Sequence, residues 1–132
     1  MSTIAGKYRF AAPVAQNYEQ WRPLYGRYGE SVGDIVDDAI ARGVFDWLLD
    51  PQHEVEAVFA FEGDRLAGFA HYRPFPRTLH ANTAGYLDDL FVSEADRGHG
   101  LARALIERVA AVGRQRGWTE VRWVTWPDSE AR

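Results

Sequence analysis

Apolar and aromatic residues recur at intervals of three and four in three segments, which predicts three amphipathic helices over residues 13–28, 31–49 and 101–116. Pro23 predicts a kink or a break in the first helix. In the second, the spacing turns Ile35, Ile40, Val44 and Leu48 inward. The third is the clearest: Leu101, Leu105, Val109 and Val112 form one stripe, and Gly117 ends it.

Shorter apolar runs between turn residues predict strands. They cover residues 55–61, 66–72, 85–92 and 120–126, with a weaker candidate at 4–11. Residues 62–65 read as the turn of a hairpin, and residues 74–82 as a polar loop. Strands 85–92 and 120–126 flank a helix, so a right-handed crossover makes them parallel. We therefore expect one α/β domain over residues 1–132, with helices flanking a mixed central sheet.

Composition narrows the class of protein. Hydrophobic residues make up 46% of the chain, enough for a sizeable core, and the net charge of -4 disfavours a partner made of nucleic acid. There is no cysteine, which excludes disulfides, thiolate zinc sites and a cysteine nucleophile. The histidines lack metal-ligand spacing, so no metal site is expected. Without an apolar run of signal-peptide or membrane-span length, the expected location is the cytoplasm, with no membrane contact.

A glycine-rich turn lies between the strand at 85–92 and the helix at 101–116. Free backbone N–H groups and the positive end of a helix dipole make such a turn a site for an anion, to which Arg97 and Arg103 could add charge. The turn does not match a P-loop, because it lacks the Lys-Ser/Thr pair. It does not match the dinucleotide fingerprint either, because Arg103 stands in place of the third glycine, which disfavours a nucleotide-binding oxidoreductase. The remaining structural alternative is a turn whose glycines provide only tightness.

The residues around this turn carry a specific resemblance. The run Y86-L-D-D-L-F-V92, followed by R97-G-H-G-L-A102, resembles the central motif of the GCN5-related N-acetyltransferases, whose pattern R/Q-x-x-G-x-G/A is filled by Arg97, Gly100 and Ala102. The resemblance is strong over roughly residues 55–126. The acidic form of the strand is most similar to the branch that contains the diamine and polyamine acetyltransferases.

The resemblance implies acetyl-coenzyme A as co-substrate. It assigns the pantetheine arm to the backbone of Leu90, Phe91 and Val92, and it makes the Leu90 amide the donor that polarises the thioester carbonyl. The pyrophosphate is assigned to the turn and the start of the helix, at Arg97, Gly98, His99, Gly100, Leu101, Ala102 and Arg103.

Amine acetylation also needs a proton acceptor, because a lysine-like amine has a pKa of about 10.4. Without cysteine, direct attack in a ternary complex is the simpler course. Asp88 and Asp89 are the candidates, and strand alternation places them on opposite faces unless a bulge intervenes. The resemblance favours Asp88 as base, and Asp89 as second choice or as the group that binds a cationic substrate. Either carboxylate could instead be a hydrogen-bonded structural residue.

The C-terminal region departs from the family pattern. Residues 127–132 look like the opening of one more helix, which in the family carries a tyrosine that protonates the departing thiolate; no counterpart is present, so we expect a C-terminally short fold. An acyl-CoA-binding module with little or no turnover is therefore the alternative function. Strand 120–126 would leave an apolar edge, which predicts a homodimer. The sequence is compatible with a small-molecule or a protein amine as acceptor; the acids around Asp88 favour a small cationic one.

Overall fold

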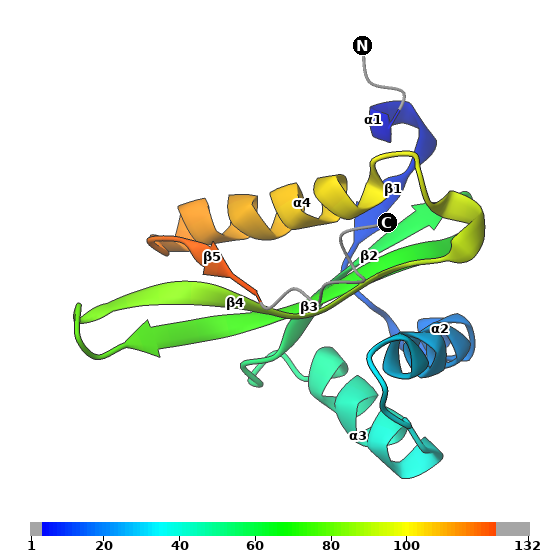
Figure 1. The fold of residues 1–132 in the computed structure, drawn as a ribbon, viewed down its shortest axis with the longest axis horizontal. Coiled ribbons are helices and arrows are strands. Elements are labelled where there is room, and N and C mark those ends of the chain that lie inside the picture. The colour runs from blue at the N-terminus through cyan, green and yellow to red at the C-terminus, as the bar shows by residue number, and fades with distance from the viewer. Residues whose placement is uncertain (1–3, 124–132) are drawn as a thin grey trace.

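The computed structural model describes residues 4–123, which form a mixed sheet of five strands in the order β1-β2-β3-β4-β5 (Figure 1). The strands are β1 (Arg9–Ala11), β2 (Glu56–Glu62), β3 (Arg65–Arg77), β4 (Asn82–Val92) and β5 (Val121–Arg122). Neighbours from β1 to β4 are antiparallel, and β4 and β5 are parallel. The α/β class with a mixed central sheet is therefore confirmed.

Helices cover both faces of the sheet. They are α1 (Ile4–Lys7), α2 (Tyr18–Ser31), α3 (Asp38–Leu49) and α4 (Leu101–Arg116), with short 3-10 turns η1 (Ala15–Asn17) and η2 (Glu94–Asp96). Figure 1 shows α2 and α3 on one face and α4 on the other. Each face has its own apolar cluster: Trp21, Phe45 and Phe69 belong to the α2 face, and Leu87, Leu101 and Val109 to the α4 face.

The phase of the second helix differs from the prediction. Ile35 and Ile40 are 82% and 47% exposed instead of facing inward. The helix begins only at Asp38, because the side chain of Asp37 caps it by accepting a hydrogen bond from the Ile40 N–H at 2.8 Å. From that start, Ala41, Phe45 and Leu48 are buried and Val44 packs partly buried against the same cluster. The inward positions of Val44 and Leu48 were expected, and those of Ala41 and Phe45 were not. The first helix runs without a break through Pro23 and ends at Ser31.

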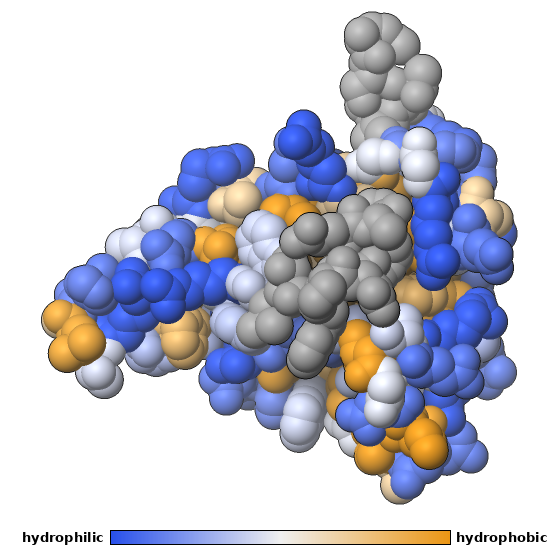
Figure 2. All heavy atoms as spheres, viewed as in Figure 1, coloured by the Kyte–Doolittle hydropathy of each residue, from blue (hydrophilic) through white to orange (hydrophobic). Residues whose placement is uncertain are grey.

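Two predicted boundaries among the strands are also wrong. Residues 4–7 are helical, and only Arg9–Ala11 forms a strand, paired with Phe59–Phe61. The predicted loop at 74–82 is mostly strand, because β3 continues to Arg77 and β4 already begins at Asn82. The cross-strand pairs that continue from Tyr72 to Arg77 build a long hairpin. Figure 2 shows this hairpin as an arm that projects from the rest of the surface.

The crossover from β4 through α4 to β5 has the predicted parallel geometry, with Gly85 opposite Val121 and Tyr86 opposite Arg122. The αL conformation of Gly117, with φ 79°, ends α4 as predicted. Residues 124–126 of the predicted final strand, and the helix expected to open at residue 127, lie outside the described residues. No helix within residues 4–123 is long and apolar enough to cross a membrane.

Candidate active site

A bulge in β4 places Asp88 and Asp89 on the same face of the sheet. In the pairing of β3 with β4, His71 lies opposite Asp89 but Tyr72 lies opposite Leu87, so Asp88 is an extra residue. Leu87 and Leu90, on either side of the pair, both pack toward the α4 face. Both carboxylates therefore point to the α2 face, where Asp88 meets Arg73 and Asp89 meets His71. Sequence analysis expected the two carboxylates on opposite faces unless a bulge intervened. The structure has that bulge, and the two carboxylates share one face.

Asp88 is partly buried against a guanidinium. The Nε of Arg73 donates to both of its carboxylate oxygens, at 3.0 and 3.2 Å. Burial raises the pKa of Asp88, and the positive charge of Arg73 opposes that rise. Arg73 also lies over the ring of Tyr86, 4.9 Å from its centroid. Arg73 directly follows the strand predicted over residues 66–72; the continuation of β3 to Arg77 is what brings it to Asp88.

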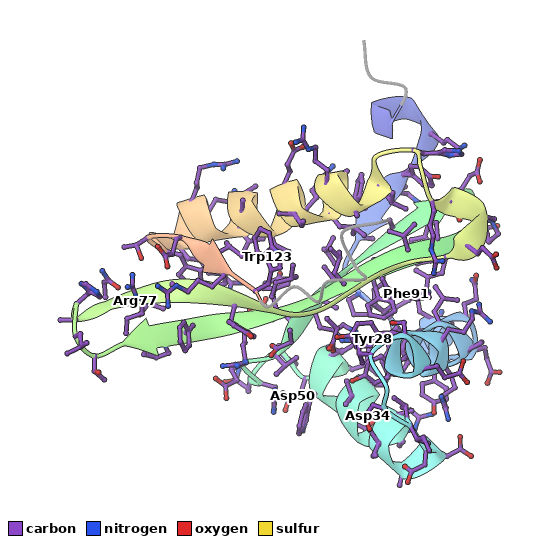
Figure 3. The ribbon with its side chains drawn as sticks, in the orientation of Figure 1. Tyr28, Asp34, Asp50, Arg77, Phe91 and Trp123 are labelled. Atoms are coloured by element: carbon purple, nitrogen blue, oxygen red, sulfur yellow. The ribbon has the colours of Figure 1, made fainter. Side chains whose placement is uncertain are left out.

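Asp89 lies among aromatic side chains. Its Oδ2 is 2.7 Å from Nδ1 of His71, whose Nε2 accepts a hydrogen bond from the Trp21 indole N–H at 3.1 Å. Burial, and then the negative charge of Asp89, raises the pKa of the hydroxyls of Tyr25 and Tyr28. Tyr28 packs edge-on against Phe91, and Figure 3 shows the two rings beside each other between α2 and the sheet.

The glycine-rich turn at the C-terminal end of β4 has the geometry of an anion site. Gly98 and Gly100 have φ of 81° and 82°, in the left-handed region that favours glycine. Within the described part of the chain, no acceptor is found for the N–H groups of Gly98, His99 and Gly100. The first turn of α4 contains no acidic residue, so no side chain competes for the positive end of its dipole. Lys7 Nζ lies 3.5 Å from Nδ1 of His99 and adds a cation.

The residues predicted to hold acetyl-coenzyme A differ in how far they are exposed to solvent. Arg97, Gly98, His99, Gly100, Ala102 and Arg103 are exposed, whereas Leu101 is buried under the turn and offers only its backbone. Leu90 is partly buried against the α4 face, and Phe91 and Val92 are buried on opposite faces. In the described residues, β5 pairs with β4 only at Gly85 and Tyr86, so the β4 edge beyond them has no described strand beside it.

A buried carboxylate that the sequence analysis did not select holds the turn in place. Asp96 is 2% exposed, and both its oxygens accept hydrogen bonds from Arg65 at 2.9 Å. Ser93 and Tyr8 donate to the same carboxylate, the latter at 2.7 Å. Burial and this hydrogen bond raise the pKa of Tyr8 to about 12. Arg65 and Tyr8 are distant from Asp96 in sequence, so no spacing indicates these contacts. The one available signal is an aspartate shortly before the predicted helix at 101–116.

Comparison with known proteins agrees with this geometry. The family model described as "Acetyltransferase (GNAT) family" matches residues 16–132. A D-amino-acid N-acetyltransferase of Saccharomyces cerevisiae is 32% identical over 110 residues, which cover 81% of this chain and 68% of the relative. An aminoglycoside N-acetyltransferase solved in complex with CoA superposes with a TM-score of 0.80 at 19% identity, covering 94% of this chain and 80% of that one. A ribosomal-protein-alanine N-acetyltransferase from Brucella melitensis biovar Abortus 2308 gives a TM-score of 0.72 at 24% identity, with coverage of 91% and 81%.

The fold and the turn thus define an acyltransferase of the kind that takes its acyl group from coenzyme A. This chain belongs to the GNAT family of N-acetyltransferases, for which acetyl-CoA is the acetyl donor. The residues present fit that co-substrate, because the turn presents left-handed glycines, N–H groups without a described acceptor and the ammonium of Lys7 beside His99.

Proposed function

We propose that this enzyme transfers the acetyl group of acetyl-CoA directly to the primary amine of a small acceptor, with both substrates bound at once. The observation that carries the proposal is the β4 bulge, which turns Asp88 and Asp89 to one face of the strand that leads into the glycine-rich turn. A carboxylate pair for a cationic amine and a backbone site for the donor then lie along a single strand. With no cysteine, an acyl-cysteine intermediate is not available.

The donor site is assigned to backbone rather than side chains. The turn from Arg97 to Arg103 would hold the pyrophosphate, with N–H groups at the α4 N-terminus and with charge from Arg97 and Arg103. The backbone of Leu90, Phe91 and Val92 would pair with the pantetheine arm along the β4 edge that β5 leaves uncovered in the described residues. The Leu90 amide would donate to the thioester carbonyl and stabilise charge on its oxygen.

The proton of the acceptor ammonium is assigned to Asp88, directly or through a water. Its raised pKa makes it a better proton acceptor than an ordinary aspartate, and Asp89 would bind the ammonium beside it. The free amine nitrogen then forms a bond to the thioester carbon as the carbon–sulfur bond breaks. Coenzyme A leaves as a thiolate, and the attacking nitrogen gives up its second proton to water. A thiol with a pKa of about 8.5 is a good enough leaving group for water to supply its proton.

A free amino acid is the acceptor class we propose first. Arg73 lies against Asp88, so the face that would receive an ammonium also carries a cation that can bind a carboxylate. A zwitterion matches this alternation of charge, whereas a diamine does not. The relative in Saccharomyces cerevisiae is a D-amino-acid N-acetyltransferase, which supports the same class. The polyamine-like form of the β4 motif makes a diamine the second class to test.

The test is thiol release from acetyl-CoA with D- and L-amino acids, a diamine and an aminoglycoside as acceptors. We expect release with amino acids, and a kcat lower by roughly 100-fold in Asp88→Asn because a general base contributes about that factor or more. Asp64→Asn is the control, since Asp64 is an exposed carboxylate in the turn between β2 and β3.

Calorimetric binding of acetyl-CoA separates the remaining outcomes. Binding without thiol release from any amine would support the coenzyme-binding module instead of the enzyme. Equal rates in Asp88→Asn and wild type would remove Asp88 from the role of base.

A further inference from the structure

His71 is a buried titratable side chain that the proposed chemistry does not use. It is 1% exposed, and both ring nitrogens are in hydrogen-bonding contact. An indole nitrogen can only donate a hydrogen bond, so the Trp21 N–H fixes Nε2 of His71 as an acceptor without a proton. The proton of the neutral ring therefore lies on Nδ1, from which it is donated to Asp89 at 2.7 Å.

Aromatic rings hold this imidazole in its orientation. It stacks on Phe69 with 4.5 Å between centroids and an interplanar angle of 21°, and Tyr25 meets it edge-on at 5.2 Å. Trp21 itself is fully buried and packs against Phe45 of α3. Because these contacts come from α2, α3 and β3, the ring cannot turn without disturbing the core of the α2 face.

The groups around Asp89 are neutral or negative. Tyr25 and Tyr28 of α2 present hydroxyls whose raised pKa keeps them uncharged, and Asp88 is the neighbouring carboxylate on β4. The side chains that β2 and α3 bury in the cluster on this face are apolar. Arg73, the nearest cation on β3, is engaged by Asp88. The ion pair between His71 and Asp89 would require a second proton on the ring, and the Trp21 N–H already points at the nitrogen that would carry it. Among the described residues, the charge of Asp89 thus has no cationic partner.

We infer that Trp21 and His71 are positioning residues that keep Asp89 oriented and free of a cation, so that the acceptor ammonium becomes its counterion. The inference rests on the proposed function and adds to it the reason for a buried Trp–His pair behind the acceptor site. A protonated His71 would itself neutralise Asp89 and compete with the substrate. By occupying Nε2, the Trp21 N–H excludes that competitor.

Trp21→Phe tests this directly, because it keeps an aromatic ring and removes the N–H. In wild type the KM for the acceptor amine should not respond to imidazole protonation. In Trp21→Phe it should rise by roughly tenfold between about pH 8 and about pH 6, where imidazoles take up protons. The KM for acetyl-CoA should stay unchanged, since the donor site is assigned to the backbone of β4 and of the turn and not to Trp21 or His71. Phe59→Leu is the control: Phe59 is fully buried in the same cluster, and among the described rings it contacts Phe61 and not His71, so the pH profile should be unaltered.

A second pair of variants keeps the inference testable if Trp21→Phe folds poorly. His71→Asn retains an N–H donor close to the position of Nδ1, whereas His71→Leu removes it. We expect the acceptor KM to stay within about threefold of wild type in His71→Asn and to rise roughly tenfold or more in His71→Leu. Equal losses in both variants, or a pH-independent KM in a folded Trp21→Phe, would overturn the inference.

Nitrogen-15 NMR of the His71 ring gives a readout that needs no turnover. The inference expects a proton on Nδ1 and none on Nε2 in wild type throughout that pH range, and a ring that takes up a proton in Trp21→Phe. A ring that is already doubly protonated in wild type would overturn the inference even if the enzyme is active. If the expected tautomer is found but no amine is acetylated, the proposed function fails, and with it the role of Asp89 as counterion.

Discussion

Asp88 and Asp96 show how two aspartates eight positions apart acquire opposite electrostatic properties. Hydrogen bonds from Arg65, then from Ser93 and Tyr8, lower the pKa of Asp96 and stabilise its charged form. Burial raises the pKa of Asp88 despite Arg73, so ionisation of Asp88 opposes folding. The first carboxylate is suited to hold a turn, and the second to accept a proton.

Asp96→Asn should lower the free energy of unfolding by about 3 kcal/mol, because it leaves a buried part of the Arg65 network without its anion. The native pKa lies below the value in the unfolded chain, so the contribution of Asp96 is fully present above about pH 4 and is lost as the pH falls further. Urea unfolding of wild type and variant at several pH values measures this difference.

Asp64→Asn is again the matched control, since its side chain is exposed, and its stability should stay within about 0.5 kcal/mol of wild type. A difference between wild type and Asp96→Asn that persists undiminished in strong acid would show that the buried network does not depend on the charge of Asp96.

At the scale of elements, one aromatic side chain sets the distance between α4 and β4. A Cβ built on Gly85 of β4 would lie 2.4 Å from Cε3 of Trp118, and one built on Gly113 of α4 would lie 2.9 Å from the same atom. The indole therefore fills the space that these glycines leave. This packing joins α4 to the strand that carries both carboxylates.

Gly113→Ala and Gly43→Ala should change stability in opposite directions, although both exchange a glycine inside a helix. Gly113 faces Trp118, so overpacking should cost about 1–3 kcal/mol. A Cβ on Gly43 of α3 meets nothing within 4 Å, so the helix propensity of alanine should stabilise by up to about 1 kcal/mol. Thermal and urea unfolding of the two variants provide the comparison, and stabilisation by both substitutions would contradict the packing described for Trp118.

Periodicity alone predicted where most elements lie, because an amphipathic helix such as α4 and an apolar strand such as β4 must bury one side or both. It failed for the phase of α3, which is set by the Asp37 cap and not by the apolar residues at Ile35 and Ile40. It also missed the length of the β3–β4 hairpin, because part of the loop predicted at 74–82, including Pro74 and Pro76, sits in paired strands.

The candidate site was predictable to a similar extent. Motif spacing located the glycine-rich turn and named Asp88 and Asp89 as a pair. The partners of that pair depend on the register of β3 against β4, which a two-residue alternation does not determine once a bulge is present. For that reason Arg73 and His71 could not be assigned to their carboxylates, and no spacing in the sequence linked Trp21 to His71.

At the scale of the whole molecule, we propose a homodimer, and the exposed apolar surface beside the edge strand β5 supports it. Trp123, next to β5, is 42% exposed and follows the short pairing of β5 with β4 (Figure 3). An apolar surface at a sheet edge can be covered by a second copy of the chain. A dimer of two 15.0 kDa chains would have a mass of about 30 kDa in a sedimentation experiment.

Sedimentation over a range of concentrations tests this proposal. Trp123→Glu should shift the chain toward the monomer by placing a charge at the edge. Leu79→Glu makes the same kind of change at the tip of the β3–β4 hairpin, where Leu79 is 94% exposed, and should leave the mass unchanged. A wild-type chain that stays monomeric at all concentrations, or an effect of Leu79→Glu alone, would exclude an interface at β5.

The bulge also sets stability and activity against each other within one strand. If Asp88 were deleted, the residues from Tyr86 through Leu87, Asp89 and Leu90 would alternate regularly between the two faces, and the ladder with β3 would be uninterrupted. A library screened only for tolerance to heat should therefore accumulate deletions at this position. The resulting variants would have a more regular sheet and lower activity, so the bulge is retained only while acetylation itself is under selection.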